Sequence, residues 1–243
     1  MASTFGDNDL RAILGTSFSS RPTEFPKAGG VNYYETYNLI ANELNSTIHP
    51  KVNIGSLLAD GSYLTDHGCD HVEMVIRRAS NLIASLECNL SGYEAYLLLM
   101  GIHFHDVGNI SGRAEHESKI SDIMQKIPLI NILESTEKRM IRDIAVTHGG
   151  KVNESKDTIG LSQLQDSDYL LGKEIRPRFL AALLRFSDEL ADENTRADRY
   201  SLEAGDIPMR NEAYHAYSNS LTSFAIDGRE ISLKFEMTIA DAT

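Results

Sequence analysis

The stretch YLLLMGIHFHDVG at residues 96–108 is apolar on every side until it reaches a histidine and an aspartate. A helix of this kind has no face suited to solvent, so we expect it to run through the centre of a domain. Ser91 and Glu94 stand three residues apart just before it, which is a capping-box signature for its start. The pattern ends at His105-Asp106, and we expect Gly108 to supply a left-handed helix cap.

Helical periodicity continues on both sides of this central segment. Thr65 or Asp66 is a suitable N-cap for the preceding helix, and Pro177 suits the first turn of a later one. Residues 152–174 are polar and hard to assign, and either a lid or an ordered loop fits them. The predicted helices cover about residues 32–45, 65–86, 92–104, 115–126, 136–148 and 177–193.

The last part of the chain changes from helical to β patterning. Apolar residues at Ile231, Leu233 and Phe235 alternate with polar ones, and Asp227-Gly228 precedes them as a hairpin turn. The fold prediction is therefore mainly α, a helical bundle with a small C-terminal β-hairpin or sheet appendage. We divide the chain into a loose N-terminal arm (1–31), a helical domain (32–205) and a β appendage (206–243), and we leave open a continuation into further C-terminal domains.

Composition sets broad limits on function. The chain of 243 residues carries 35 acidic and 23 basic residues, a formal net charge of -12. This charge disfavours nucleic acid as a partner without excluding it. Two separate cysteines fit a reducing compartment, and no signal peptide or membrane-crossing stretch is visible, so a cytoplasmic protein is expected.

The adjacent His105 and Asp106 are the strongest local chemical signal. An imidazole beside a carboxylate can bind a divalent cation, and a carboxylate at the end of an apolar helix is costly unless it is paired or metal-bound. Taken alone, the dipeptide favours the other interpretation, a helix terminus that simply faces solvent, because short motifs have many false positives. The surrounding residues decide between these readings, because His71 precedes the pair on one helix and Asp188 follows it on another.

In this order, H…HD…D on successive helices resembles the HD superfamily of metal-dependent phosphohydrolases. The matching segments are Thr65 to His71, His105 to Asn109 and Phe186 to Leu190, and the resemblance spans about residues 63–196. It implies an HD-type helical bundle. It also implies that His71, His105, Asp106 and Asp188 bind a first metal ion. HD proteins with a second ion add histidines between the HD pair and the last aspartate, and His116 and His148 occupy those places.

The resemblance further implies the chemistry of the site. One or two divalent ions (Mn, Fe, Ni, Co, Mg or Zn) would be bound, and Asp106 would bridge two of them. Metal-activated hydroxide would then hydrolyse a phosphate ester or anhydride. In the cyclic dinucleotide phosphodiesterases of this superfamily a lysine follows the motif's glycine, but here Asn109 stands in that place.

Three further residues are candidates for supporting roles. Arg113 is a candidate phosphate clamp, although a surface arginine is an equal alternative, and Lys151 is a weaker candidate of the same kind. His67 shares a helical face with His71 and fits either an extra ligand or an outer-shell role. His103 is expected to be a core histidine, and His49 is expected to lie in a loop with a structural role.

We expect the substrate to be a small phosphorylated molecule, such as a nucleotide or cyclic nucleotide. Two alternatives stay open at this point. The chain could be a regulatory nucleotide-binding HD module of a larger multidomain protein, or a single-strand-specific nuclease. The negative charge and the lack of a basic, aromatic stripe argue mildly against the nuclease.

Overall fold

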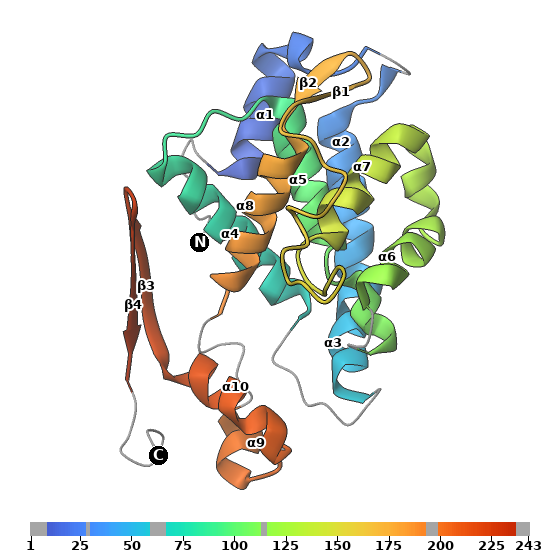
Figure 1. The fold of residues 1–243 in the computed structure, drawn as a ribbon. Helices are drawn as coiled ribbons and strands as arrows, with labels where there is room; N and C mark the ends of the chain where they lie inside the picture. Colours follow the sequence, from blue (N-terminus) through green and yellow to red (C-terminus); the bar gives the residue numbers. More distant parts are fainter. Residues whose placement is uncertain (1–8, 28–29, 59–66, 113–115, 193–198, 237–243) are drawn as a thin grey trace.

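The computed structural model describes residues 9–27, 30–58, 67–112, 116–192 and 199–236. The protein is mainly helical with small two-stranded sheets, as predicted (Figure 1). Its α-helices are α1 (Leu10–Ser20), α2 (Tyr33–Glu43), α3 (His49–Leu58), α4 (Cys69–Ser85), α5 (Gly92–Phe104), α6 (His116–Gln125), α7 (Ser135–Val146), α8 (Pro177–Glu189), α9 (Arg199–Ala204) and α10 (Met209–Ser220).

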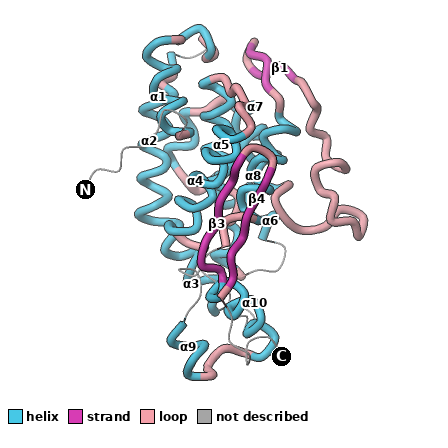
Figure 2. The backbone as a smooth tube through the Cα atoms, turned by 90° about the vertical axis from the view of Figure 1, so that its left-hand side faces the viewer, coloured by secondary structure: helices cyan, strands magenta, loops and turns pink. Residues whose placement is uncertain are grey.

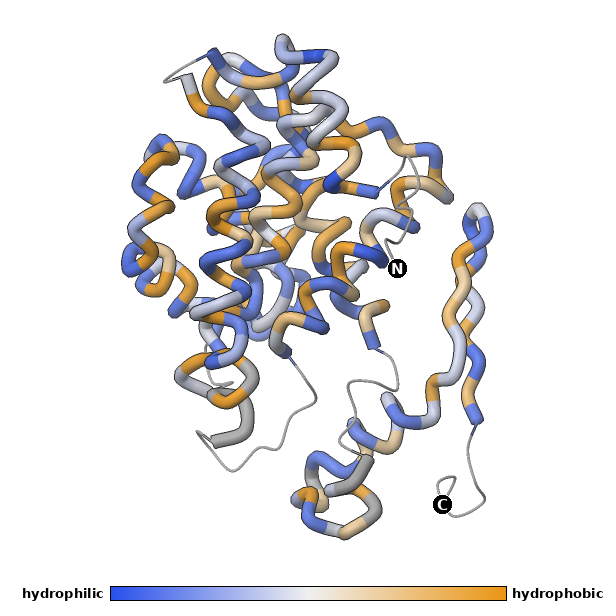
Figure 3. Tube along the Cα trace, turned by 180° about the vertical axis from the view of Figure 1, so that it is seen from behind, coloured by the Kyte–Doolittle hydropathy of each residue, from blue (hydrophilic) through white to orange (hydrophobic). Residues whose placement is uncertain are grey.

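Helix α5 is the centre of the bundle, as its apolar sequence predicts. Each of its residues is buried, and the capping box between Ser91 and Glu94 is formed at its start. Helices α1, α2, α4, α7 and α8 all contact it. In Figure 3 the apolar residues gather in the middle of this helical layer. Burial of the whole helix makes its C-terminal end a fixed point from which a functional site can be built.

Two expectations for the N-terminal part were wrong. Within the region expected to be a loose arm, α1 is a helix whose Leu10 and Leu14 are fully buried in the core, with Asp9 as its N-cap. His49 does not lie in a loop but begins α3, after a π-helical turn at Leu44–Ile48. Helix α1 carries only a short apolar pattern. Its burial depends on contact with α5, and the local sequence does not reveal that contact.

The region after α5 also differs from the prediction. Gly108 does not form a left-handed cap, because the chain continues from α5 into a 3-10 helix at Val107–Ser111. Gly112, with a φ of 94°, ends that turn instead. The predicted N-cap residues Thr65 and Asp66 lie outside the described residues. Gly68 occupies the N-cap position of α4, which begins at Cys69. Elsewhere, short 3-10 turns cover Pro22–Glu24 and Pro128–Ile132.

The polar segment 152–174 is an ordered loop that leads into a small hairpin. Its strands β1 (Asp168–Leu170) and β2 (Lys173–Ile175) pair antiparallel, with Leu170 and Ile175 buried. The predicted C-terminal hairpin is present as β3 (Leu221–Asp227) and β4 (Glu230–Phe235). The second strand ends at Phe235, and residues 237–243 lie outside the described part.

The C-terminal hairpin runs beside α4 and α8, on the side of the bundle opposite α6 (Figures 1 and 2). Arg78 of α4 joins it to the bundle: the guanidinium carbon lies 3.7 Å from the ring centre of Phe224, and Nε donates to the Leu190 carbonyl at 2.9 Å. Among the helices described, none combines the length and the apolar composition needed to cross a bilayer.

Candidate metal centre

Six predicted ligands meet at helix ends. His71 lies in the first turn of α4, and the His105-Asp106 pair directly follows α5. His116 is the first residue of α6, and His148 lies just beyond the end of α7. Asp188 lies in the last turn of α8. Helix ends carry backbone groups without partners inside the helix and allow the chain to change direction, so separate helices can point ligands at one place.

The first group of ligands consists of His71, His105, Asp106 and Asp188. His71 Nε2 lies 3.2 Å from His105 Nε2 and 3.1 Å from Asp188 Oδ1. Asp106 Oδ2 lies 3.5 Å from His71 Nε2 and 3.2 Å from His105 Nε2. His105 Nε2 is 3.7 Å from Asp188 Oδ1. Both imidazoles and Asp106 are buried, whereas the Asp188 side chain is 23% exposed and forms the open side of the group.

The second group shares Asp106 with the first. Asp106 Oδ1 lies 3.3 Å from His116 Nε2 and 3.5 Å from His148 Nε2, and the two Nε2 atoms are 3.2 Å apart. The ligand atoms of His71, His105 and Asp106 are close enough together to hold one ion, and those of Asp106, His116 and His148 are close enough to hold another. One carboxylate therefore faces both groups, one oxygen to each.

The hydrogen bonds of the histidines show what the two groups require. His105 Nδ1 lies 2.6 Å from the Ile102 carbonyl and His148 Nδ1 lies 2.7 Å from the Ala145 carbonyl. A carbonyl only accepts, so each Nδ1 carries the proton, and in the neutral ring Nε2 presents a lone pair. The Nε2 lone pairs and the carboxylate oxygens thus converge in each group. Divalent metal ions suit such a set of ligand atoms.

The charges of the residues in the two groups show the same demand for positive charge. Burial lowers the pKa of His105, but Asp106 and Asp188 outweigh burial and raise that pKa to about 10. Burial raises the pKa of Asp106, but His105, His116 and His148 outweigh it and hold the pKa well below its usual range. The pKa of Asp188 is lowered in the same way by His105 and His71 against burial. Without metal, protons would supply the missing positive charge.

Comparison with known proteins agrees with this geometry. The model of the HD-CE family matches residues 61–243. The chain belongs to the HD-CE family. HD-CE is an HD-related family, the match covers all six candidate ligands, and the two buried groups are consistent with an HD metal site. No curated protein and no solved structure matched the chain.

In this HD-CE protein Asn109 and Gly108 hold the second group in place. Asn109 is fully buried, and its Nδ2 donates to Asp106 Oδ1 at 2.9 Å. Gly108 touches the backbone of His116 so closely that a Cβ atom there would lie 1.8 Å from the His116 carbonyl oxygen. Glu117 Oε2 lies 3.2 Å from His116 Nδ1 and orients that ring.

Sequence reasoning missed the roles of Asn109, Gly108 and Glu117. In the sequence, Asn109 stands out only because it replaces the lysine of the cyclic dinucleotide phosphodiesterases. Its spacing of one 3-10 turn from Asp106 is the signal that could have found its contact. Glu117 could have been found because it adjoins His116 and can accept from the imidazole Nδ1.

The other predicted residues occupy different positions. His67 is buried beside His71, with ring centres 5.5 Å apart, next to the first group. His103 is a core histidine, as expected: its Nδ1 lies 3.2 Å from Nε2 of the buried His49, and its Nε2 lies 3.3 Å from the Tyr37 hydroxyl. Arg113 lies outside the described residues. Lys151 is exposed, and its Nζ is 3.5 Å from Glu154.

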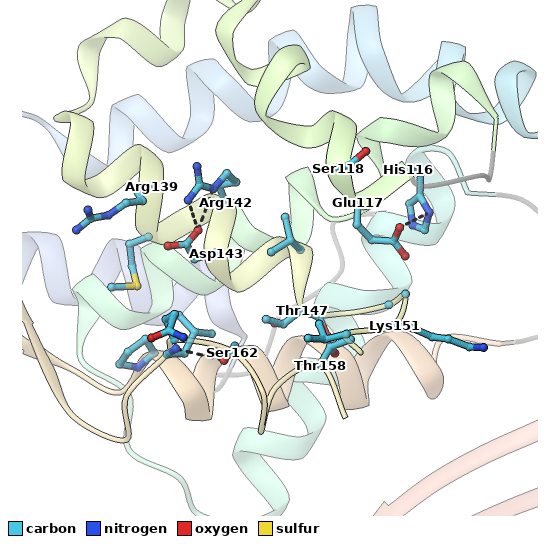
Figure 4. Close-up of a pocket in the computed structure, with 18 of the residues that line it drawn as sticks. His116, Glu117, Ser118, Arg139, Arg142, Asp143, Thr147, Lys151, Thr158 and Ser162 are labelled. Carbon is cyan, nitrogen blue, oxygen red and sulfur yellow. Dashed lines mark hydrogen bonds and ion pairs between the residues drawn. The ribbon is translucent and has the colours of Figure 1, made fainter. Parts of the chain in front are cut away.

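A large cavity begins at the second group. Its volume is about 1360 Å³, and it is lined by α6, α7 and the loop after α7, with His116, Glu117 and Lys151 among the lining residues (Figure 4). The HD-CE site therefore has an adjoining space in which a ligand can be held.

Proposed function

We propose that this chain is a metal-dependent phosphohydrolase that cleaves a phosphate ester or anhydride, with a nucleotide or cyclic nucleotide as its substrate. The observation that carries the proposal is Asp106, whose two oxygens each face a separate group of buried histidines. Membership of the HD-CE family supports a hydrolase, and the adjoining cavity supports a substrate larger than phosphate.

The candidate ligands form two sets, and each set would hold one ion. His71, His105, Asp106 and Asp188 would hold the first ion. The second would be held by Asp106, His116 and His148. Imidazole-rich sets of this kind favour transition metals such as Mn, Fe, Co, Ni or Zn over Mg, which prefers oxygen ligands. When bound, a pair of divalent ions supplies a water of lowered pKa and positive charge for the phosphoryl oxygens.

The protein itself supplies position and a low dielectric. Three of the histidines have Nδ1 fixed by a carbonyl or a carboxylate, so their Nε2 atoms stay directed at the ligand centres. Burial of His105 and Asp106 excludes solvent from the inner side. Asp188 is the partly exposed ligand, so the substrate phosphate would approach from its side and from the cavity at His116. Lys151 lines that cavity and remains a candidate phosphate clamp.

The test combines metal content with hydrolysis. Metal bound to the purified protein is measured by mass spectrometry. The protein is then stripped with chelator and reloaded separately with Mn²⁺, Fe²⁺, Co²⁺, Ni²⁺, Zn²⁺ or Mg²⁺. Turnover of bis-p-nitrophenyl phosphate and of nucleotides is followed in each form. We expect two ions per chain and hydrolysis with at least one transition metal.

Asp106→Ala and Asp70→Ala form a matched pair of variants. Asp106 serves both groups, so its loss should remove bound metal and hydrolysis together, whereas Asp70 is an exposed carboxylate on the first turn of α4 and its loss should change neither. A protein that binds two ions and nucleotide but hydrolyses nothing would overturn the enzyme and favour a regulatory nucleotide-binding module. Hydrolysis restricted to single-stranded nucleic acid would replace the small substrate with a nuclease substrate.

A further inference from the structure

The cavity beside the second group of ligands is much larger than a phosphate ion requires. Its volume of about 1360 Å³ exceeds that of most small-ligand pockets, which hold about 300–1,000 Å³. Helix α7 forms one wall, and its lining residues recur along the helix from Arg139 to Thr147. At about 1.5 Å per residue, that wall is roughly 12 Å long.

The loop 149–164 also lines the cavity, and it is held by a side chain of α8 and by a backbone carbonyl just after α7. Arg185 of α8 donates from one NH group to the Lys156 carbonyl and to the Thr158 hydroxyl, each at 2.8 Å. The Thr158 hydroxyl in turn donates to the Thr147 carbonyl at the end of α7. Thr158 is buried, so this part of the loop is packed against the helical bundle.

Figure 4 shows the two ends of the groove. His116 and Glu117 lie at one end and Arg139 lies at the other, with Arg142 and Asp143 between them. Arg142 is paired with Asp143 through its Nε at 2.8 Å, so its charge is neutralised. Within the described part of the chain, no carboxylate pairs with Arg139 or with Lys156, another lining residue. The charge of Arg139 is thus left for a ligand away from the metal end.

The rest of the lining restricts the ligand further. Met140, Leu164 and Pro177 supply apolar surface, and among the described lining residues no phenylalanine or tyrosine is present. Stacking of successive bases on aromatic rings, the usual means of holding long single strands, is therefore not provided by these residues. A ligand with one anionic group at the metal end and a second anionic group at the far end matches the groove, and its middle part would lie between them, where the Arg142–Asp143 pair also lies.

We infer that the groove binds a linear molecule of dinucleotide size that carries two phosphates, one placed at the metal centre and the other at Arg139. This inference rests on the proposed function for its choice of reacting phosphate. A guanidinium is suited to the second phosphate because its planar fork offers paired donors to phosphate oxygens. A mononucleotide would leave the Arg139 end of the groove without its anion.

The experiment compares Arg139→Glu with Lys138→Glu. Both variants reverse a charge on α7, but Lys138 does not line the groove. For each protein, kcat/KM is measured with a 5′-phosphorylated dinucleotide and with bis-p-nitrophenyl phosphate, which has no second anionic group. We expect the kcat/KM for the dinucleotide, divided by the kcat/KM for bis-p-nitrophenyl phosphate, to fall at least tenfold in Arg139→Glu. In Lys138→Glu this ratio should stay at the wild-type value.

A binding measurement separates this inference from the proposed function. With chelator present, so that no hydrolysis occurs, the dissociation constant of the dinucleotide should rise at least tenfold in Arg139→Glu. If the protein hydrolyses neither compound but this binding difference is found, the groove assignment stands and the enzyme does not. If hydrolysis is found but Arg139→Glu changes neither the ratio nor the dissociation constant, the groove assignment is overturned and the enzyme stands.

Discussion

His71 Nε2 lies 3.1 Å from Asp188 Oδ1, which joins the beginning of α4 to the end of α8. Both atoms face His105, which the central helix α5 presents at its end. The first ligand group is therefore assembled from three helices that meet only after the bundle has packed. A metal ion bound there would stabilise the folded chain, because the unfolded chain has no such site.

The two ligand groups can be separated by mutation. Asp188→Asn removes a charged ligand from the first group, and His148→Gln removes an imidazole from the second. Each should lower the tightly bound metal from two ions toward one per chain, as measured by mass spectrometry after dialysis. Asp188→Asn retaining both ions at wild-type affinity would contradict the ligand assignment.

Asn109 is predicted to act on metal binding without being a ligand. Its amide holds Asp106 Oδ1 at 2.9 Å, so Asn109→Ala frees the bridging carboxylate to rotate. Loss of such an outer partner commonly weakens metal binding or activity about 10–100-fold. Competition with a chelating dye measures the affinity. Asn109→Asp, which keeps the shape but lacks the donor, should show a loss of similar size.

Gly108 is predicted to be required for the second ion. A methyl group at this position would overlap the His116 carbonyl oxygen, which lies 1.8 Å from the ideal Cβ position, so Gly108→Ala must displace the start of α6. We expect the second ion to be lost while the first is retained. Gly15→Ala is the control, because its Cβ would meet only the exposed side chain of Tyr34 at 3.2 Å. Two ions in Gly108→Ala would count against this role.

The buried His49–His103 pair predicts acid sensitivity. Burial, followed by the charge of His105, lowers the pKa of His49 from 6.5 to about 4, and burial lowers that of His103 as well. As pH falls, the unfolded chain therefore takes up these protons before the folded chain does. The contribution of the pair to the free energy of unfolding is complete above about pH 6.5 and declines between pH 6.5 and 4. His49 accounts for at most about 3 kcal/mol of this decline.

Urea unfolding between pH 4.5 and 7.5, with chelator present, measures this effect. His49→Gln cannot take up a proton, so the free energy of unfolding of the variant should fall less steeply with decreasing pH than that of the wild type. His105, whose pKa is raised to about 10, contributes its pH dependence above pH 6.5, so the two proteins are compared between pH 4.5 and 6.5. Parallel pH curves for the two proteins would refute the assignment.

Glu137 is predicted to stabilise the far side of the core. It is fully buried, and its Oε1 accepts from the Tyr33 hydroxyl at 2.8 Å and from the Tyr93 hydroxyl at 2.7 Å. Glu137→Ala leaves two buried hydroxyls without their acceptor, at a cost of about 1–3 kcal/mol each. Urea unfolding measures the loss. Thr136→Ala, at an exposed position on the same helix, is the control and should cost much less, because its side chain is exposed to solvent.

Local patterns carried most of the fold prediction. The apolar run 96–104 predicted a buried helix because a side chain on every face needs a packed neighbour, and α5 is that helix. The alternation before and after Asp227-Gly228 predicted β3 and β4 because a two-residue period matches the pleat. Helix α1 was missed, since its burial depends on contact with α5 rather than on a strong pattern of its own.

The sequence by itself determined which residues could be ligands, because imidazole and carboxylate chemistry belongs to the residue and the order H…HD…D is visible in one dimension. Only the tertiary structure decided that Asp106 turns one oxygen to each histidine group, that Gly108 admits the backbone of His116, and that Arg139 faces the same groove as the metal centre. These relations are distances between separate helices. They are set by how the helices pack around α5, which no local pattern specifies.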